Sequence, residues 1–234
     1  MSNGKLVILF GAPGSGKGTQ ALLLADKKKM NHLEASKLLE KKFIKTKSED
    51  VIKLEGVEYS LKEQERRWRE GLLVEDGFVA CVMKENIRMA KEDGLSVLID
   101  GYPRTVGQAE LALPFVLSLY KASDILVIYL EVGEDESLKR NTNRRICSLM
   151  RHSIINLPET KDLTICPVDG SSLEKRTLDN PETIEVRLKN FRKKTLPVID
   201  YLESQKIKVS RIDGMGTISD VFFRILKEAE KFGI

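Results

Sequence analysis

The chain has 234 residues, of which 41% are hydrophobic and 32% are charged, and its net charge is +4. These values are typical of a folded protein with one substantial core, and they exclude an intrinsically disordered chain. The small net charge gives no argument for nucleic acid as a partner. No apolar stretch approaches the roughly 20 residues of a spanning helix, so we expect no membrane segment and a cytoplasmic location. Three cysteines favour reduced thiols or a metal site over disulfides.

The first pattern in the chain is an apolar strand, residues 6–10, followed by the glycine-rich stretch 11–19 and an apolar helical pattern. The stretch 11–19 matches G-x-x-x-x-G-K, with Lys17 at its end. Glycines let successive backbone N–H groups point into one concave surface of the loop. The N-terminus of the following helix adds its partial positive charge to that surface. The stretch therefore predicts a phosphate-binding loop, which we call the phosphate loop. The usual Ser or Thr after the lysine is replaced by Gly18, and Thr19 follows one place later.

Apolar, β-branched runs alternate with long helical patterns along the rest of the chain. The expected strands are residues 6–10, 31–33, 95–99, 125–130 and 207–212. Strands separated by helices need crossover connections, so we expect a three-layer α/β fold with a five-stranded parallel sheet. Ligands of such sheets bind beyond the carboxyl ends of the strands, where the phosphate loop and Asp100 both lie.

Two stretches do not fit this alternation. Residues 34–74 show no strand pattern, and we expect a helical insertion with helices at 36–47 and 61–70. Residues 144–177 are rich in turns and contain Cys147 and Cys166. A turn-rich stretch of that length inside a compact domain is typical of a lid or a binding module.

Asp100 directly follows the expected strand 95–99 and begins the sequence Asp-Gly-Tyr-Pro-Arg-Thr, residues 100–105. An acidic residue there can hold the water shell of a magnesium ion bound to phosphates, and Arg104 would lie in the same cleft. With Gly-Ala-Pro-Gly-Ser-Gly-Lys-Gly-Thr-Gln at 11–20, the chain closely resembles the adenylate kinase family of nucleoside monophosphate kinases. In that family the Gly18-Thr19 order is normal. The resemblance extends over nearly the whole chain.

The resemblance implies a P-loop NTPase fold in three parts. They are a core formed by residues 1–33, 75–143 and 178–234, an NMP-binding arm formed by 34–74, and a lid formed by 144–177. It also implies roles for individual residues. The residues expected to contact ATP are Gly14, Ser15, Gly16, Lys17, Gly18, Thr19, Arg140 and Gly216. The residues expected to contact the acceptor nucleotide are Ala35, Lys37, Lys41, Val74, Gly101, Arg104 and Gln108. The residues expected to be catalytic are Lys17, Arg104, Arg140, Arg144, Arg176 and Arg187, and Asp100 would hold Mg²⁺ through water.

These cations suit phosphoryl transfer, because the reaction brings several negative charges together and depends on positioning and electrostatic stabilisation. The resemblance implies a monomeric enzyme that transfers phosphate reversibly from Mg·ATP to AMP, giving two ADP, with small nucleotides as its partners. The alternatives are a UMP/CMP-type pyrimidine monophosphate kinase and a nucleotide-binding regulator without catalytic activity.

The first acceptor motif departs from the family pattern at three positions. Ala35 replaces a threonine, as in the uridylate/cytidylate kinase branch, while Lys37 replaces an aspartate and Glu40 replaces an arginine that binds the acceptor phosphate. Lys37 and Lys41 lie on one helical face and are hypothesised to supply the missing cation. Gln108 and the long lid favour AMP, since amide hydrogen bonds discriminate strongly between base edges.

The lid contains a second candidate site. Cys147 and the sequence Cys166-Pro167-Val168-Asp169 resemble the zinc-binding lids of some family members. Met150 stands at the second ligand position and is a poor zinc ligand, but His152 could complete a Cys-His-Cys-Asp set. The alternative is a metal-free lid with two buried cysteines.

Overall fold

A five-stranded parallel sheet forms the centre of the molecule in the computed structural model, which describes residues 4–45, 51–142, 144–155, 157–175 and 179–234. The strands lie in the order β10-β6-β1-β5-β2, and every neighbouring pair is parallel. Their bounds are β1 Leu6–Gly11, β2 Asn31–Glu34, β5 Val97–Asp100, β6 Ile125–Glu131 and β10 Lys208–Asp213. The α/β fold and the five-stranded parallel sheet predicted from the sequence are confirmed.

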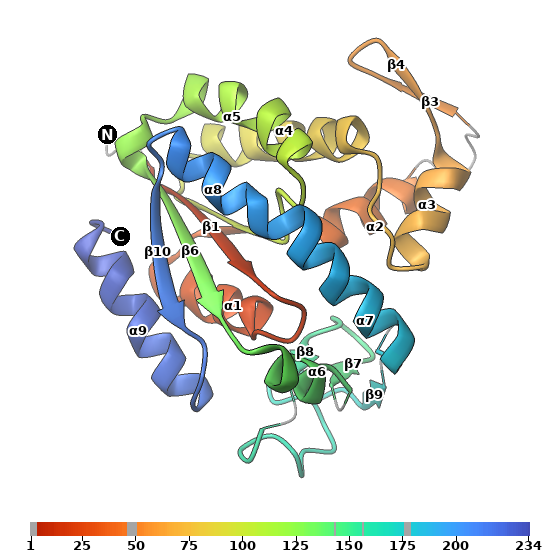
Figure 1. Ribbon diagram of the computed structural model, residues 1–234, viewed down its shortest axis with the longest axis vertical. Coiled ribbons are helices and arrows are strands. Elements are labelled where there is room, and N and C mark those ends of the chain that lie inside the picture. Colours follow the sequence, from red (N-terminus) through yellow and green to blue (C-terminus); the bar gives the residue numbers. More distant parts are fainter. Residues whose placement is uncertain (1–3, 46–50, 143, 156, 176–178) are drawn as a thin grey trace.

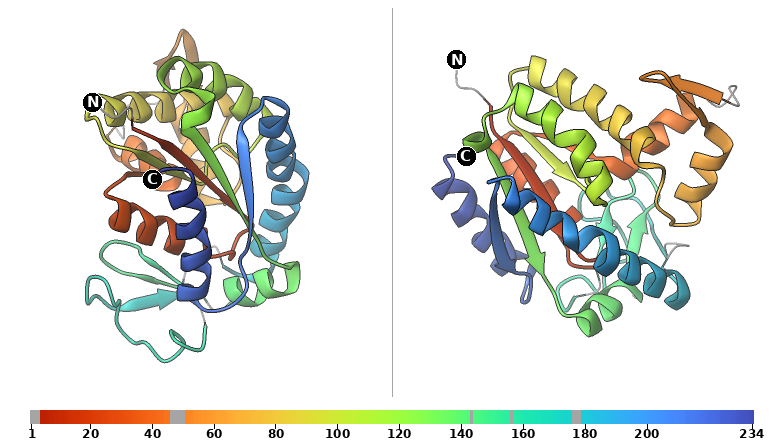
Figure 2. Two further views of the ribbon diagram at one scale, coloured as in Figure 1. Left: turned by 90° about the vertical axis from the view of Figure 1, so that its left-hand side faces the viewer. Right: turned by 45° about the horizontal axis from the view of Figure 1, so that its top comes forward.

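Helices cover both faces of this sheet (Figures 1 and 2). Helices α1 (Lys17–Lys28) and α9 (Ile218–Lys231) pack on one face. Helices α4 (Asp76–Glu92), α5 (Val106–Leu119) and α8 (Leu196–Ser204) pack on the other. Side chains of β1 alternate between the two layers, as the pleat of a strand requires. Burial on both faces explains why the three central strands, β1, β5 and β6, appear in the sequence as nearly unbroken apolar runs.

The remaining core elements lie near the carboxyl ends of the strands or connect to them. They are the short 3₁₀ helix η1 (Ala122–Asp124), α6 (Glu134–Thr142), α7 (Pro181–Asn190) and the π-helical segment η2 (Phe191–Thr195). Segments α7, η2 and α8 follow one another without a break and cross the sheet as one long rod (Figure 1). Among the described residues, no helix is long and apolar enough to cross a membrane.

The predicted arm, residues 34–74, contains α2 (Ala35–Lys45), α3 (Leu61–Arg69) and between them an antiparallel hairpin, β3 (Val51–Leu54) and β4 (Val57–Ser60). The prediction that this stretch has no strands was therefore wrong. Glu55 and Gly56 turn the hairpin with φ values of 46° and 85°, the positive pair that tight hairpin turns need. Strands of four residues are too short for their alternation to stand out in the sequence. The hairpin projects away from the sheet (Figure 1).

Both predicted arm helices are present. Helix α2 begins one residue before the expected start, and residues 46–47 of that prediction lie outside the described residues. Phe43 of α2 contacts Trp68 of α3 with ring centroids 6.0 Å apart, and it stacks on Phe78 of α4 at 5.8 Å. These aromatic contacts hold the arm helices to each other and to the core.

The described part of the predicted lid, residues 144–177, contains a three-stranded antiparallel sheet in the order β8-β7-β9. Its strands are β7 (Arg145–Cys147), β8 (Ser153–Ile154) and β9 (Leu173–Lys175). The sequence predicted only turns here, because strands of two or three residues are too short to show a periodic pattern.

Candidate active site

The phosphate loop connects the end of β1 to the start of α1 at the carboxyl edge of the sheet. Gly14 has a φ of 82° and packs against α6, where an added Cβ would lie 2.5 Å from Asn141 Nδ2 and 2.7 Å from the Ser137 carbonyl oxygen. Ser137 Oγ also donates a hydrogen bond to the Pro13 carbonyl. Helix α6 thus packs against the loop. Position 14 requires glycine because its φ is positive and because a side chain there would clash with α6.

One large cavity opens over the phosphate loop and is bounded by the core, the arm and the lid. Most of the site residues predicted from the sequence line it. They are Gly14, Gly16, Lys17, Gly18, Thr19, Ala35, Lys37, Val74, Asp100, Gly101, Arg104, Gln108, Arg144 and Arg187. Ser15, within the loop, is itself buried, and Arg176 lies outside the described residues.

Lys17 stands among several other charges at the base of this cavity. Burial lowers the pKa of Lys17 to about 8, against the attraction of Asp100 and together with the repulsion of Arg104 and Arg187. Its Nζ donates to the Ala12 carbonyl at 3.3 Å. Cations gathered this closely repel one another until a polyanion binds between them, so the site is complementary to phosphate.

Asp100 ends strand β5 beside Glu34, which ends the neighbouring strand β2 in the same register. The Asp100 side chain is buried, and its Oδ1 has no hydrogen-bond partner within the described part of the chain. Burial raises the pKa of Asp100, while Lys17 opposes this shift. A buried carboxylate oxygen without a partner next to a phosphate site fits the predicted role of holding the water shell of Mg²⁺.

Arg104 is held in place by its own loop and by helix α5. Its Nε donates to the Gly101 carbonyl at 2.8 Å, and its backbone N–H donates to Gln108 Oε1 at 2.7 Å. Gln108 lies in the first turn of α5, where Thr105 caps its backbone N–H. Arg104 is exposed to solvent in the open cavity, but the protein packed around its guanidinium partly desolvates it and lowers its pKa, while Asp100 and Glu34 act in the opposite direction. The loop thus presents one cation and one amide side by side in the cavity.

A single carboxylate orients two of the predicted arginines. Arg144 donates to both oxygens of Asp179, at 2.7 and 2.6 Å, and Arg187 Nη1 lies 3.1 Å from Asp179 Oδ1. Arg144 and Asp179 are both buried. A bidentate pair fixes the plane of a guanidinium, so Asp179 determines how both arginines enter the cavity.

Arg140 and Gly216 are not among the residues that line the cavity. Arg140 is buried on α6, where its Nε bonds Glu136 at 2.7 Å and its Nη1 donates to the Gly214 carbonyl at 3.1 Å. The loop between β10 and α9, which contains Gly216, is therefore tied to the helix that supports the phosphate loop.

On the arm side, Glu34, Lys37 and Glu40 all line the cavity. Lys37 Nζ lies 3.1 Å from Glu34, so its charge is already paired, while Lys41 is exposed and lies outside the cavity lining. Sequence reasoning missed Glu34, although its place at a strand end opposite Asp100 could have indicated it. It also missed Arg151, which lines the cavity from the lid with a positive φ of 55°.

The lid lies directly over the phosphate loop. Thr19 Oγ1 is 3.5 Å from the Ser153 carbonyl oxygen, and Ile155 Cδ1 is 3.4 Å from the place where a Cβ on Gly16 would stand. The lid therefore covers the side of the cavity where the terminal phosphates of a nucleotide are expected.

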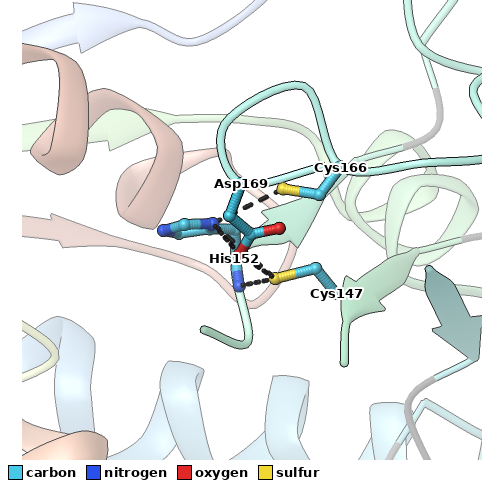
Figure 3. Close-up of side chains that lie close together, drawn as sticks. All are labelled: Cys147, His152, Cys166 and Asp169. Carbon is cyan, nitrogen blue, oxygen red and sulfur yellow. Dashed lines mark hydrogen bonds and ion pairs between the residues drawn. The ribbon is translucent and has the colours of Figure 1, made fainter. Parts of the chain in front are cut away.

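Cys147, His152, Cys166 and Asp169 point toward one another in the lid (Figure 3). Their ligand atoms all lie within 4.8 Å of one another. Cys147 Sγ is 3.6 Å from His152 Nδ1 and 3.1 Å from Asp169 Oδ2, and Cys166 Sγ is 3.5 Å from His152 Nδ1. Met150 is 55% exposed and stands outside this group. The ligand types and their spacing suit one tetrahedral metal ion.

Comparison with known proteins agrees with this site. The family model for adenylate kinase matches residues 9–207. An adenylate kinase of Staphylococcus aureus is 36% identical over 219 residues, which cover 92% of this chain and 94% of that protein. An adenylate kinase of Methanothrix thermoacetophila is 34% identical, covering 97% and 99% of the two chains, and one of Bacillus subtilis is 35% identical, covering 92% and 94%. This chain therefore belongs to the adenylate kinase family and is a nucleotide-binding phosphotransferase.

Proposed function

We propose that the protein transfers the γ-phosphoryl group of Mg·ATP reversibly to AMP, giving two ADP. The observation that carries this proposal is the gathering of Lys17, Arg104, Arg144 and Arg187 around one cavity that also contains Gln108. A protein that merely binds nucleotides has no need for several cations between the two halves of its site. Transfer between two polyanions does need them.

The residues of the chain act by positioning and by charge. The backbone of the phosphate loop and Lys17 bind the donor phosphates, and Arg104 binds the acceptor phosphate. Arg144 and Arg187, held by Asp179, stabilise the charge on the group in transfer. No general base is required, because a monophosphate with a second pKa of about 6 is largely ionised at pH 7. The lid excludes water that would otherwise hydrolyse ATP.

Magnesium fits this site through Asp100, whose buried Oδ1 lacks a partner among the described residues. When bound, the ion neutralises charge on the phosphate oxygens during transfer. Asp100 would hold it through its water shell, and burial without a partner keeps that carboxylate available.

AMP is the favoured acceptor because the Gln108 amide reaches the cavity with its Oε1 already oriented by the Arg104 N–H. Its Nε2 then remains to donate to the edge of a base. Ala35, which is buried and lines the same cavity, favours the alternative of a pyrimidine monophosphate.

A coupled assay of ADP formation tests the proposal with ATP and each of AMP, UMP, CMP, dTMP and GMP. We expect the highest kcat/KM with AMP. A higher kcat/KM with UMP or CMP would show the pyrimidine alternative to be right. Absence of turnover with all five, from folded protein that binds ATP, would contradict a kinase and favour a nucleotide-binding regulator.

We propose further that Cys147, His152, Cys166 and Asp169 hold a structural Zn²⁺ in the lid. Ser171 donates its N–H and its hydroxyl to Asp169 Oδ1, at 3.0 and 2.7 Å, which leaves Oδ2 directed toward the other ligands. Elemental analysis of the purified protein should find about one equivalent of zinc. Less than about a tenth of an equivalent would support the metal-free lid instead.

We also propose that the chain is divided into a core (1–33, 75–143 and 178–234), an arm (34–74) and a lid (144–177). We propose that it works as a monomer in the cytoplasm. Light scattering after size exclusion should give a mass near 26.4 kDa. A mass of twice that value would contradict the monomer.

A further inference from the structure

The rod formed by α7, η2 and α8 contains an irregular turn beside the active site. In η2 the Leu196 N–H bonds to the Phe191 carbonyl five residues back, the pattern of a π-helix. Pro197 follows immediately and accounts for this geometry, because proline has no N–H to donate and its ring clashes with the carbonyl four residues earlier. Wide turns of this kind are frequent at functional sites.

The hydroxyl of Thr195, the last residue of η2, forms its hydrogen bond outside its own helix. Helical threonines and serines commonly bond a carbonyl three or four residues back, as Thr142 bonds Leu138 and Ser204 bonds Tyr201. Thr195 Oγ1 instead donates to the backbone carbonyl of Arg104 at 2.9 Å, across 91 residues of chain, and Thr195 is 9% exposed. The donor end of this bond is therefore buried.

This hydrogen bond is the third one that holds Arg104 in place. Its N–H is held by Gln108 and its Nε by the Gly101 carbonyl, so the bond from Thr195 fixes the remaining backbone polar group. Thr195 and Arg104 also line a smaller cavity of about 70 Å³ together with Lys17 and Arg187. The contact thus lies at the edge of the region where the phosphates are expected.

We propose that Thr195 is a positioning residue for phosphoryl transfer, whose hydroxyl holds the Arg104 backbone so that the Arg104 guanidinium meets the acceptor phosphate. This inference rests on the proposed role of Arg104 in acceptor binding. Small displacements of a group that binds a reacting phosphate weaken binding and rate, so the hydroxyl should act on the acceptor and not on ATP.

The test compares Thr195→Val, which removes the hydroxyl at nearly equal volume, with Thr195→Ser, which keeps it. We expect Thr195→Val to raise KM about 5- to 10-fold for the monophosphate that the wild type uses best, with KM for ATP changed less than about twofold. Thr195→Ser should restore both values to within about twofold of wild type. Ser204→Ala, which removes a hydroxyl from the same rod far from Arg104, is the control and should match wild type. If Thr195→Val does not fold, Thr195→Ala takes its place.

A double-mutant cycle separates this inference from the proposed function. In an Arg104→Ala background, Thr195→Val should have no further effect on KM for the acceptor, because the group it positions is gone. An undiminished effect in that background, equal changes in both KM values, or no change in either would overturn the inference. If Arg104→Ala itself leaves KM for the acceptor unchanged, the proposed role of Arg104 fails, and the inference fails with it.

Discussion

The donor and acceptor halves of the site are built from different kinds of contact. The phosphate loop is fixed by its backbone, which packs on α6 so closely that Gly14 has no room for a side chain. The proposed acceptor half depends in part on side chains of α2 that line an open cavity, where Lys37 is paired with Glu34 and Glu40 stands where the family resemblance implies an arginine. Backbone packing resists substitution, whereas side chains that line a cavity can be exchanged without loss of the fold.

The largest effect should follow from Lys17→Met in the donor half. Loss of the cation that meets the transferring phosphate should lower kcat by about 10³-fold, since such contacts strengthen in the transition state. Steady-state kinetics with saturating ATP measures this. Lys27→Met, an exposed lysine on the same helix, is the matched control and should keep wild-type kcat. Equal activity of both variants would mean that the phosphate loop is not catalytic.

Glu40→Arg tests whether the acceptor half of the site lacks a cation. A cation at this position should lower KM for the monophosphate by about 10- to 100-fold, because charge-assisted hydrogen bonds contribute about 1.5–3 kcal/mol. Glu40→Gln removes the negative charge without adding a cation and should give a smaller decrease. A higher KM for the arginine variant would indicate that Glu40 contacts the acceptor productively.

ATP affinity should depend on pH through Lys17. The pKa of Lys17 in the free site is about 8, so the lysine is charged below pH 8 and loses its proton above it. Bound phosphates favour the charged form, so above pH 8 ATP binding must take up a proton and affinity should fall by up to about tenfold per pH unit. Titration calorimetry between pH 7 and 9.5 measures this. Lys17→Arg should remove the slope, and an equally steep slope in that variant would assign it to another group.

The smallest effects concern the proposed replacement of the missing cation. Lys37→Ala should raise KM for the monophosphate by no more than about threefold, because Glu34 already neutralises much of its charge. Lys41→Ala should leave KM unchanged, because Lys41 lies outside the cavity lining. If Lys37→Ala also has no effect, neither lysine replaces the arginine.

Sequence reasoning predicted the features that depend on local pattern. The parallel strands, the phosphate loop and Asp100 at a strand end were visible because their apolar runs and glycine spacing are set by the backbone. The hairpin of the arm was missed because its strands have only four residues each, too few to stand out, although Lys53 and Glu58 occupy the exposed positions of an alternating pattern. The different positions of Lys37 and Lys41 depend on how the arm packs against the core, which helical periodicity does not specify. The same limit applies to the hydrogen bond between Thr195 and Arg104, which joins residues far apart in the chain.

The reverse reaction tests the central claim most directly. Purified protein incubated with ADP and Mg²⁺ alone should convert ADP into ATP and AMP in equal amounts, as separated by ion-exchange chromatography. Lys17→Met protein should produce neither at a comparable rate. Unchanged ADP, or AMP and phosphate without ATP, would contradict reversible transfer between two adenine nucleotides.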